Sequence, residues 1–355
     1  SLDLWLRDQA EALCVGRQWL PLLPAALTKA AAFKPGESQA ALSVALEISA
    51  DGALEHYRFY RSQIKPVAVV DTAAIQALAD RKPKSRTLPA ALKGLKDHLP
   101  LLENLLAVTD VLQQRRLAAG SIDLALGHPP LDSLGDLAVP APDSALQGWF
   151  VQLPSHHPMA LLREAALVAD RAMGQHLSAL QLPALYAANP AADPSDLNDV
   201  AKAALALEIP LELSEEGDAN ASELATAFAA TDRCRALQQQ LQAALKPVEL
   251  TTTASDHALA GLMGDESALA PWCFPGLHYA DLWNQQVLAL LLSEGKDRPS
   301  VRHKTSVDLA SDACIGAIDW PLLAPSAVTP FNEALDHGLA QRLNGRRRFM
   351  AELHR

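Results

Sequence analysis

Apolar residues recur at three- and four-residue steps through much of the chain, and this spacing predicts amphipathic helices. The clearest series runs from Tyr279 to Leu291, and Gly295 follows where a helix should stop. The same spacing occurs in three further stretches: 2–13, 88–116 and 159–177. Within the second of these, Pro100 is expected to break the helix in two. The pattern therefore predicts a chain rich in helix.

A different pattern, strict alternation of apolar with other residues, predicts one pair of strands. The alternating residues are Leu42, Val44, Leu46 and Ile48. Asp51 and Gly52 come next as a hairpin turn, and residues 53–64 can return as the second strand. The pattern therefore predicts at least one strand pair among the helices.

Composition narrows the class of protein. Of the 355 residues, 49% are hydrophobic, 20% charged and 5% aromatic, which is typical of a globular protein and favours helix. The four cysteines lie far apart without a Cys-x-x-Cys pair, so we expect reduced thiols and a cytoplasmic location. No stretch is apolar enough to span a membrane, and no signal peptide is visible. The net charge of −11 means that any contact with a polyanion must be local.

The stretch around the strongest helix resembles a motif of the RNB catalytic domain, which is found in ribonuclease II and ribonuclease R. The family pattern is Thr-Ser-Pro-Ile-Arg-Arg/Lys-Tyr-x-Asp-Leu, followed by Asn/His. The matching residues are Pro275, Tyr279, Asp281, Leu282 and Asn284. The two basic positions carry Leu277 and His278 instead. Because the first family arginine contacts the scissile phosphate, Leu277 removes that contact, since leucine has no hydrogen-bond donor.

Two N-terminal stretches extend the resemblance. Residues 33–48 resemble Leu-x-Pro-Gly-Glu-x-x-x-Ala-Leu-Ser-Val, which includes the predicted hairpin. Residues 14–24 resemble Tyr-Leu-Pro-Gly-x-x-x-Pro-Met-Leu-Pro. The family tyrosine stacks on a base at the RNA 3′ end, and Cys14 stands at its position. A thiol offers no aromatic face for stacking.

The predicted helix at 159–177 resembles the central family helix, Leu-x-Glu-Glu-x-Met-x-x-Ala-Asn. The pair of acids is Arg163-Glu164 here, and Asp170 stands at the asparagine. By resemblance Glu164 is a candidate site acid; the alternative is a carboxylate on the surface. The resemblance therefore gives three candidate catalytic residues: Tyr279, His278 and Glu164.

Family members use Mg²⁺ held by an aspartate cluster that precedes the hairpin. Carboxylate oxygens suit this cation, which activates a water molecule. No Asp-x-Asp-Asp occurs in this chain, so we predict no metal ligands in it. Three acids, Asp193, Asp196 and Asp199, are spaced three apart at a predicted helix start, which is typical of capping and solvation.

Basic residues gather in two predicted turns, 81–86 and 296–304. From them we name Lys84, Arg86, Arg302 and Lys304 as candidate RNA contacts, because RNA binding is carried largely by phosphate neutralisation. The alternative for the first turn is an ordinary solvated loop.

The resemblance implies a mixed α/β (α+β) fold, in which helices wrap a curved mixed sheet. It also implies an RNB-type domain over 1–295 and a basic helical extension over 296–355. It implies 3′→5′ hydrolytic exoribonuclease activity on single-stranded RNA. We predict that this chain alone is inactive, because Leu277 and Cys14 replace functional residues and the metal cluster is missing. The alternative is a degenerate pseudo-nuclease that serves as an RNA- or protein-binding scaffold.

Overall fold

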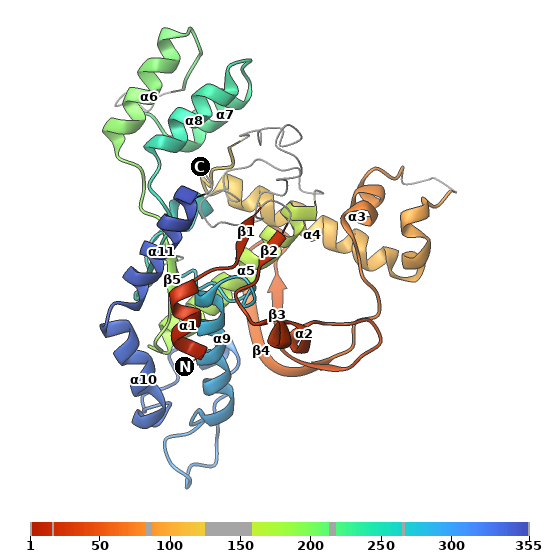
Figure 1. Cartoon of the computed structure of the whole chain (residues 1–355), viewed down its shortest axis with the longest axis vertical. Coiled ribbons are helices and arrows are strands. Elements are labelled where there is room, and N and C mark those ends of the chain that lie inside the picture. The colour runs from red at the N-terminus through yellow and green to blue at the C-terminus, as the bar shows by residue number, and fades with distance from the viewer. Residues whose placement is uncertain are drawn as a thin grey trace.

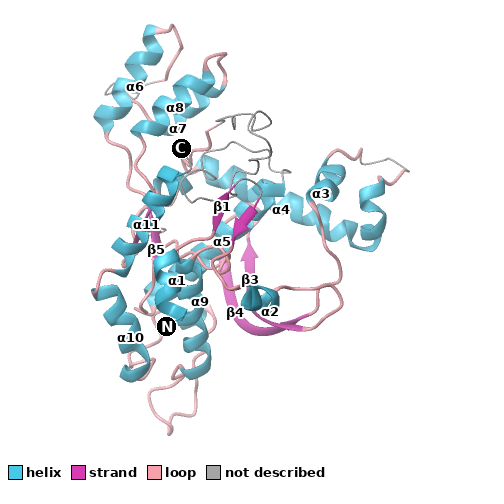
Figure 2. Cartoon of the chain, viewed as in Figure 1, coloured by secondary structure: helices cyan, strands magenta, loops and turns pink. Residues whose placement is uncertain are grey.

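The computed structural model describes residues 2–15, 18–82, 87–124, 158–212, 218–264 and 267–353. Within these ranges helices dominate, and the strands form three two-stranded antiparallel sheets (Figures 1 and 2). The mixed α+β fold predicted from the sequence is thus confirmed. The strands lie in small separate pairs among the helices, and the longest pair is strongly bent (Figure 1).

That longest pair is the predicted hairpin, β3 (Gln39–Ile48) with β4 (Leu54–Ile64). Gly52 in the turn has a φ of +83°, a value that glycine adopts without steric cost. Tyr57 and Phe59, two residues apart on β4, both turn into the core. The alternation seen in the sequence therefore places one face of the hairpin against the helices.

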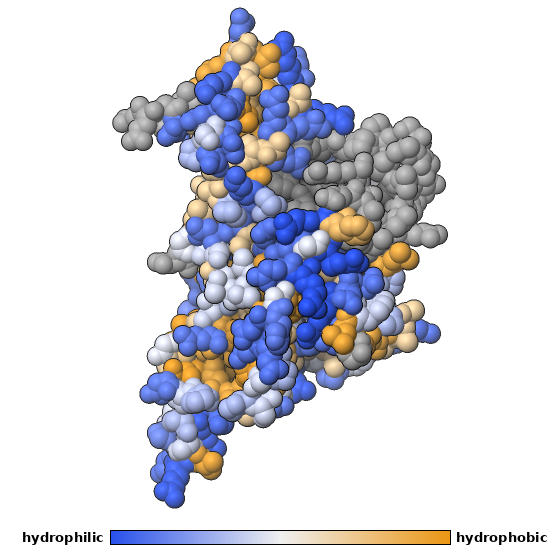
Figure 3. Space-filling view, turned by 60° about the vertical axis from the view of Figure 1, so that its left-hand side comes forward, coloured by the Kyte–Doolittle hydropathy of each residue, from blue (hydrophilic) through white to orange (hydrophobic). Residues whose placement is uncertain are grey.

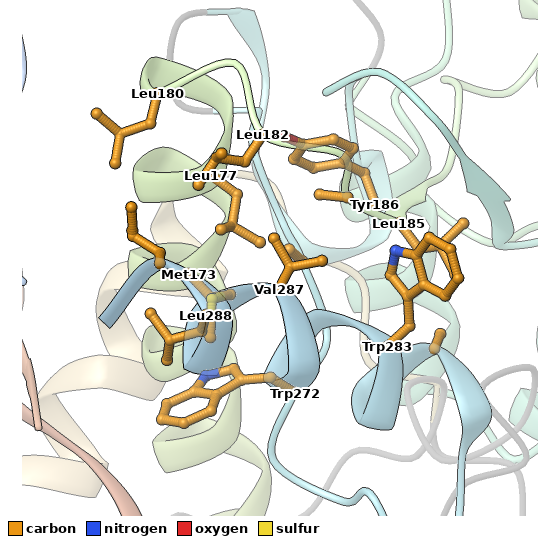
Figure 4. Packing of buried hydrophobic residues seen from close by; sticks show 14 of the residues in the cluster. Met173, Leu177, Leu180, Leu182, Leu185, Tyr186, Trp272, Trp283, Val287 and Leu288 are labelled. Atoms are coloured by element: carbon orange, nitrogen blue, oxygen red, sulfur yellow. The ribbon is translucent and has the colours of Figure 1, made fainter. Parts of the chain in front are cut away.

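Two helices, α5 (Pro158–Ala179) and α9 (Tyr279–Glu294), lie at the centre of the molecule (Figure 1). Their apolar faces meet in the main hydrophobic core, which Figure 4 shows from close by. Buried members from these helices and the segments around them include Met173, Leu177, Trp272, Trp283, Val287 and Leu288. Each such side chain stabilises the fold by roughly 1.5–3 kcal/mol.

Gly174 sits where α5 meets the segment that precedes α9. A Cβ atom built on this glycine would lie 2.3 Å from the backbone oxygen of Ala268, closer than van der Waals contact allows. Glycine is therefore required at this position for the close approach of backbone to helix.

The remaining elements surround this centre. They are α1 (Leu2–Gln9), β1 (Leu13–Val15), β2 (Gln18–Leu20), α2 (Ala25–Ala31), α3 (Thr72–Ala79), a 3₁₀ helix (Ala90–His98), α4 (Leu99–Ala118), β5 (Tyr186–Ala188), α6 (Pro194–Ala206), α7 (Ala221–Ala229), α8 (Cys234–Ala244), β6 (Glu249–Thr251), short 3₁₀ turns (Ala258–Ala260 and Asp312–Cys314), α10 (Pro325–Asp336) and α11 (Leu339–Leu353). Helices α6 to α8 form a lobe with its own apolar core (Figure 1). Pro100 lies in the first turn of α4, where proline is tolerated, so the change at this point is from 3₁₀ to α-helix.

Two buried asparagines attach helices to strand segments. Each forms hydrogen bonds with both the backbone N–H and the backbone C=O of one residue in or beside a strand. Asn284 accepts the Leu185 N–H at 3.0 Å and donates to the Leu185 oxygen at 2.8 Å. Asn344 of α11 does the same with Leu250 of β6, at 2.7 and 2.8 Å. The Asn284 amide also donates to the Pro271 oxygen at 2.8 Å. These side chains fix α9 and α11 against β5 and β6.

Polar residues cover much of the coloured surface in Figure 3, and apolar residues gather mainly in one area at its lower left. Among the described helices, none is both long and apolar enough to cross a membrane.

Candidate functional site

The N-terminal segment and the motif near Tyr279, which both belong to the stretch that resembles the RNB family, meet at the start of α9. The segment after α1 pairs with the residues that open α9, through an antiparallel bridge between Glu11 and His278. The Ala12 N–H donates to the Leu277 oxygen at 2.7 Å, and the Tyr279 N–H donates to the Ala10 oxygen at 2.8 Å. The chain thus brings its N-terminal segment onto the loop that carries the motif.

Tyr279, a predicted catalytic residue, lies in the core with 1% of its surface exposed. Its hydroxyl donates to Asp3 at 2.6 Å and accepts from the Arg7 Nε at 3.1 Å, both on α1. Burial raises the pKa of this phenol above its ordinary value. In this structure the Tyr279 hydroxyl joins α1 to α9.

His278 belongs to a small ionic cluster. Its Nδ1 lies 3.5 Å from Glu11 Oε1, and the same oxygen lies 2.7 Å from the Nε of Arg347 on α11. Burial raises the pKa of Glu11, but Arg347 and His278 outweigh it, so the net pKa is lowered. Burial lowers the pKa of His278, but the hydrogen bond to Glu11 and the charge of Asp281 raise it overall. Arg347 thus holds Glu11 as a carboxylate, with the His278 ring beside it.

Glu164, the third candidate, is only 2% exposed and is surrounded by charged partners. Arg116 donates to both of its oxygens, at 2.8–3.2 Å, and Arg163 donates to Oε1 at 3.2 Å. Asp123 completes the group and accepts from both arginines, at 2.8 and 3.1 Å. The alternative of a surface carboxylate is therefore wrong. Glu164 lies in a buried four-residue ion network, which we call the α5 ion network.

A second buried cluster joins an acid of α5 to an acid of α9, and no sequence pattern predicts this pairing. Asp170 accepts the Trp272 N–H at 3.1 Å, and Asp281 of α9 accepts the Phe274 N–H at 2.8 Å. Cys273 lies between these two contacts, and its Sγ is 3.9 Å from the Ala166 oxygen. Burial and the neighbouring Asp281 raise the pKa of Asp170 well above its usual range. Burial also raises the pKa of Asp281. We call this the buried acid pair.

The ionic cluster of Glu11, His278 and Arg347 lines a pocket with a volume of about 80 Å³, and the buried acid pair lines the same pocket. Its polar lining is Glu11, Arg163, Asp170, His257, His278, Asp281 and Arg347. The rest of the lining is apolar, from the segment after α1, α5, β6, the loop before α9 and α11. The pocket therefore combines charged groups from the start, middle and end of the chain.

The other candidate residues lie elsewhere. Arg302 and Lys304 are exposed in the loop that follows α9, at the opposite end of that helix from His278. Sixteen residues of helix separate these two ends by about 24 Å. Lys84 and Arg86 lie outside the described residues. Cys14 is on β1, opposite Trp19 on β2, and its side chain is also outside the described part.

In the described residues no group of three or more His, Cys, Asp or Glu is placed to hold a metal ion. The buried acid pair does not fit Mg²⁺, because each acid already binds a backbone N–H and raised pKa values favour the protonated form. Asp193 caps α6 through the Ser195 N–H. Asp196 and Asp199 form ion pairs instead: the Nζ atoms of Lys246 and Lys202 lie 3.6 and 2.8 Å from their carboxylate oxygens. Capping and solvation, as predicted, account for these three acids.

Comparison with solved structures shows the class of fold. The chain matches Mycoplasma genitalium RNase R in complex with ribose-methylated single-stranded RNA, with a TM-score of 0.71 and 12% identity. The match covers 99% of this chain and 48% of the other. It also matches yeast Ssd1, described as a pseudonuclease, with a TM-score of 0.57, 12% identity, and coverage of 98% and 38%. At this identity the likeness shows a shared fold.

The family follows from the sequence itself. The RNB domain model matches residues 1–294, so the chain belongs to the RNB domain family. It is 28% identical, over 351 residues, to the acetazolamide conferring resistance protein zam of Synechocystis sp.. That match covers 97% of this chain and 42% of the relative. The chain thus spans less than half the length of these relatives.

Proposed function

We propose that this chain is an RNA-binding RNB domain that holds single-stranded RNA and, on its own, does not hydrolyse it. The match in fold to RNase R in complex with single-stranded RNA supports the RNA binding. One observation carries the absence of hydrolysis. Glu164, the acid that the resemblance assigns to the active centre, is closed off by Arg116 and Arg163 in the α5 ion network. A carboxylate held by two buried guanidinium groups is not available to bind a cation or to orient water.

The sequence supports the same proposal. Transition-state charge on a phosphate needs a cationic donor, and Leu277 supplies none. Removing one such donor typically lowers kcat by ~10²–10³-fold. His278 is bound to Glu11, and Tyr279 is bound to Asp3, so neither replaces it in the present arrangement. The free thiols of Cys273 and Cys314 suit a reducing compartment, and a cytoplasmic location is part of the proposal.

A second candidate is a 3′→5′ exoribonuclease that needs more than this chain. The chain spans 42% of its curated relative and 48% of the RNase R chain. Residues of a longer protein would then supply the Mg²⁺ ligands, as the family resemblance implies. This candidate shares RNA binding with the first and differs in the fate of the bound RNA.

The test is incubation of the purified chain with 3′-labelled single-stranded RNA and Mg²⁺ or Mn²⁺. We expect binding that weakens steeply with salt, and no release of nucleotide. The double charge reversal R302E/K304E should reduce affinity, whereas the single reversal K202E on exposed α6 should not. Stepwise release of nucleotide monophosphates that a substitution in this chain abolishes would show the proposal wrong.

A further inference from the structure

Helix α11 lies beyond the residues that match the RNB family, and its two faces differ in composition. The inner face packs against α1 and β6, and its residues are buried at positions 339, 340, 343, 344 and 347. The outer face is exposed at positions 341, 342, 345, 348 and 349. Because the inner face holds the helix in place, packing within the chain does not set the composition of the outer face.

Arginines dominate the charge of this helix. It carries four arginines and one acid, Glu352. Arg347 turns inward, where its Nε lies 2.7 Å from Glu11, and the other three lie on or beside the outer face. Arg348 lies 3.8 Å from Glu249 with 63% of its side chain exposed, so this ion pair neutralises little of its charge. The outer face is therefore a positively charged surface on a chain whose net charge is −11.

An aromatic ring accompanies these charges. Phe349 keeps 49% of its surface exposed. The guanidinium carbon of Arg346 lies 5.6 Å from the centre of this ring, within the range of a cation–π contact. Single-stranded nucleic acids are bound by this combination, in which basic groups follow the phosphates and aromatic rings stack on the bases.

A glycine lies at the centre of the outer face. Gly345 is the seventh of fifteen residues in the helix, a position where glycine is less favourable than alanine because it loses more backbone freedom on folding. A Cβ atom built on Gly345 would meet nothing within 4 Å, in contrast to the Cβ built on Gly174. Packing within the described chain therefore does not require this glycine. Arg342, Arg348 and Phe349 lie three or four positions away, so they border the bare backbone.

We propose that this surface, which we call the α11 arginine face, binds a strand of single-stranded RNA. The face consists of Arg342, Gly345, Arg346, Arg348 and Phe349. Its arginines neutralise phosphates, its ring stacks on a base, and its glycine lets the RNA backbone approach the helix closely. The exposed ring favours nucleic acid over an acidic protein segment, because every base offers a face for stacking and a carboxylate offers none.

The inference rests on the proposed function for its choice of RNA, and it adds a second contact site. The loop after α9, which carries Arg302 and Lys304, lies far from the C-terminal end of α11 in Figure 1. The two basic surfaces can therefore be removed one at a time.

The experiment measures binding of a fluorescently labelled oligouridylate to the full chain in EDTA, by anisotropy, over a range of salt concentrations. We expect R342Q/R348Q to bind severalfold more weakly. Each lost phosphate contact removes about 0.7 from the slope of log K against log salt, so this variant should flatten the slope by about 1.4. The control K93Q/K96Q removes two exposed cations from the 3₁₀ helix Ala90–His98 and should keep the affinity and slope of the wild type.

Two single variants separate RNA binding from a structural role. F349L keeps an apolar side chain without a ring, so it should weaken binding of RNA but not of heparin, a polyanion without bases. G345A should raise the melting temperature, because alanine favours helix, and should weaken RNA binding, because its methyl group obstructs the approach of the RNA backbone. A purely structural role would not give these opposite effects.

The outcomes distinguish this inference from the proposed function. Wild-type RNA affinity in R342Q/R348Q, or an equal loss in K93Q/K96Q, overturns the inference. Unchanged RNA affinity in F349L identifies a surface for polyanions in general, such as an acidic protein, and overturns the nucleic-acid site. RNA binding that depends on Arg302 and Lys304 alone leaves the proposed function standing. No RNA binding by the wild type means that both fail.

Discussion

Helix α5 carries two buried charged clusters that differ in how their charges are balanced. In the α5 ion network, two arginines face two acids, and every partner lies within 3.2 Å. In the buried acid pair, the charge of Asp281 acts on Asp170, and the hydrogen-bond partners of the two acids are backbone N–H groups and the Cys273 thiol. In the α5 ion network, arginines neutralise the acids. In the buried acid pair, a bound proton must neutralise a carboxylate.

This difference decides how each cluster responds to change. Removing one member of a balanced network leaves a buried charge without its partner, and the cost is large at any pH. Two acids that share a low-dielectric site keep a proton because they cannot both ionise cheaply. The first cluster is therefore sensitive to mutation, and the second is sensitive to pH.

The largest effect is expected from E164A, which leaves Arg116 and Arg163 to share Asp123. We expect a loss of about 3–5 kcal/mol in the free energy of unfolding, measured with urea at pH 7. The control K202M breaks the exposed pair with Asp199, which is worth about 0–1 kcal/mol. The double variant R163M/E164M should cost less than E164A, because it removes one charge of each sign. Equal losses of unfolding free energy in E164A and K202M would show that the α5 ion network is no more sensitive to mutation than an exposed ion pair.

D170N is expected to change the pH dependence of stability, because asparagine keeps a neutral group at this position. The raised pKa of Asp170 means that the folded state retains its proton while the unfolded state loses it near pH 4. Wild-type stability should therefore fall as pH rises above about 4, at about 1.4 kcal/mol per unit until the folded pKa is reached.

The measurement is thermal unfolding of the wild type and D170N at pH 5 and pH 8. D170N should be the more stable protein at pH 8, with a smaller difference at pH 5. D281N removes the other acid and should flatten the profile in the same direction. Parallel profiles for wild type and D170N would mean that the pair holds no proton.

The smallest effect concerns a buried polar group outside both clusters. Gln238 of α8 is fully buried, and its amide oxygen and nitrogen have no partner among the described residues. Q238M keeps the length and removes the polar atoms, so it should stabilise the fold by about 1–3 kcal/mol. Gln239 is exposed on the same helix, and Q239M should stay within about 0.5 kcal/mol. Destabilisation by Q238M would show that the amide has a partner in the folded chain.

Much of the fold could be predicted from local patterns. The helices at 159–177 and 279–291 and the hairpin around Gly52 follow from spacing that a single segment contains. The 3₁₀ helix before α4 could not be predicted in this way. Pro100 is compatible either with the first turn of a new helix or with a break inside one helix.

The site was harder to predict because its residues are paired across the chain. Glu164 could be either a site acid or a surface acid, since its partner Arg116 is 48 positions away. Glu11 and Arg347 meet from opposite ends of the sequence, and only the basic run of the terminal helix hinted at the second. The motif at Tyr279 was identified by resemblance to the family. The position of the Tyr279 hydroxyl could not be predicted, because its hydrogen-bond partners are on α1.

The two asparagines that bind Leu185 and Leu250 have a consequence for association between molecules. A two-stranded sheet has two open edges, and exposed backbone groups there can recruit a strand from another chain. Asn284 occupies the N–H and C=O groups of Leu185 at the entry to β5, and Asn344 occupies those of Leu250 on β6. A carboxamide copies the donor and acceptor of a peptide but cannot extend into a further strand. Each side chain therefore ends the growth of the β5–β6 sheet on its own side.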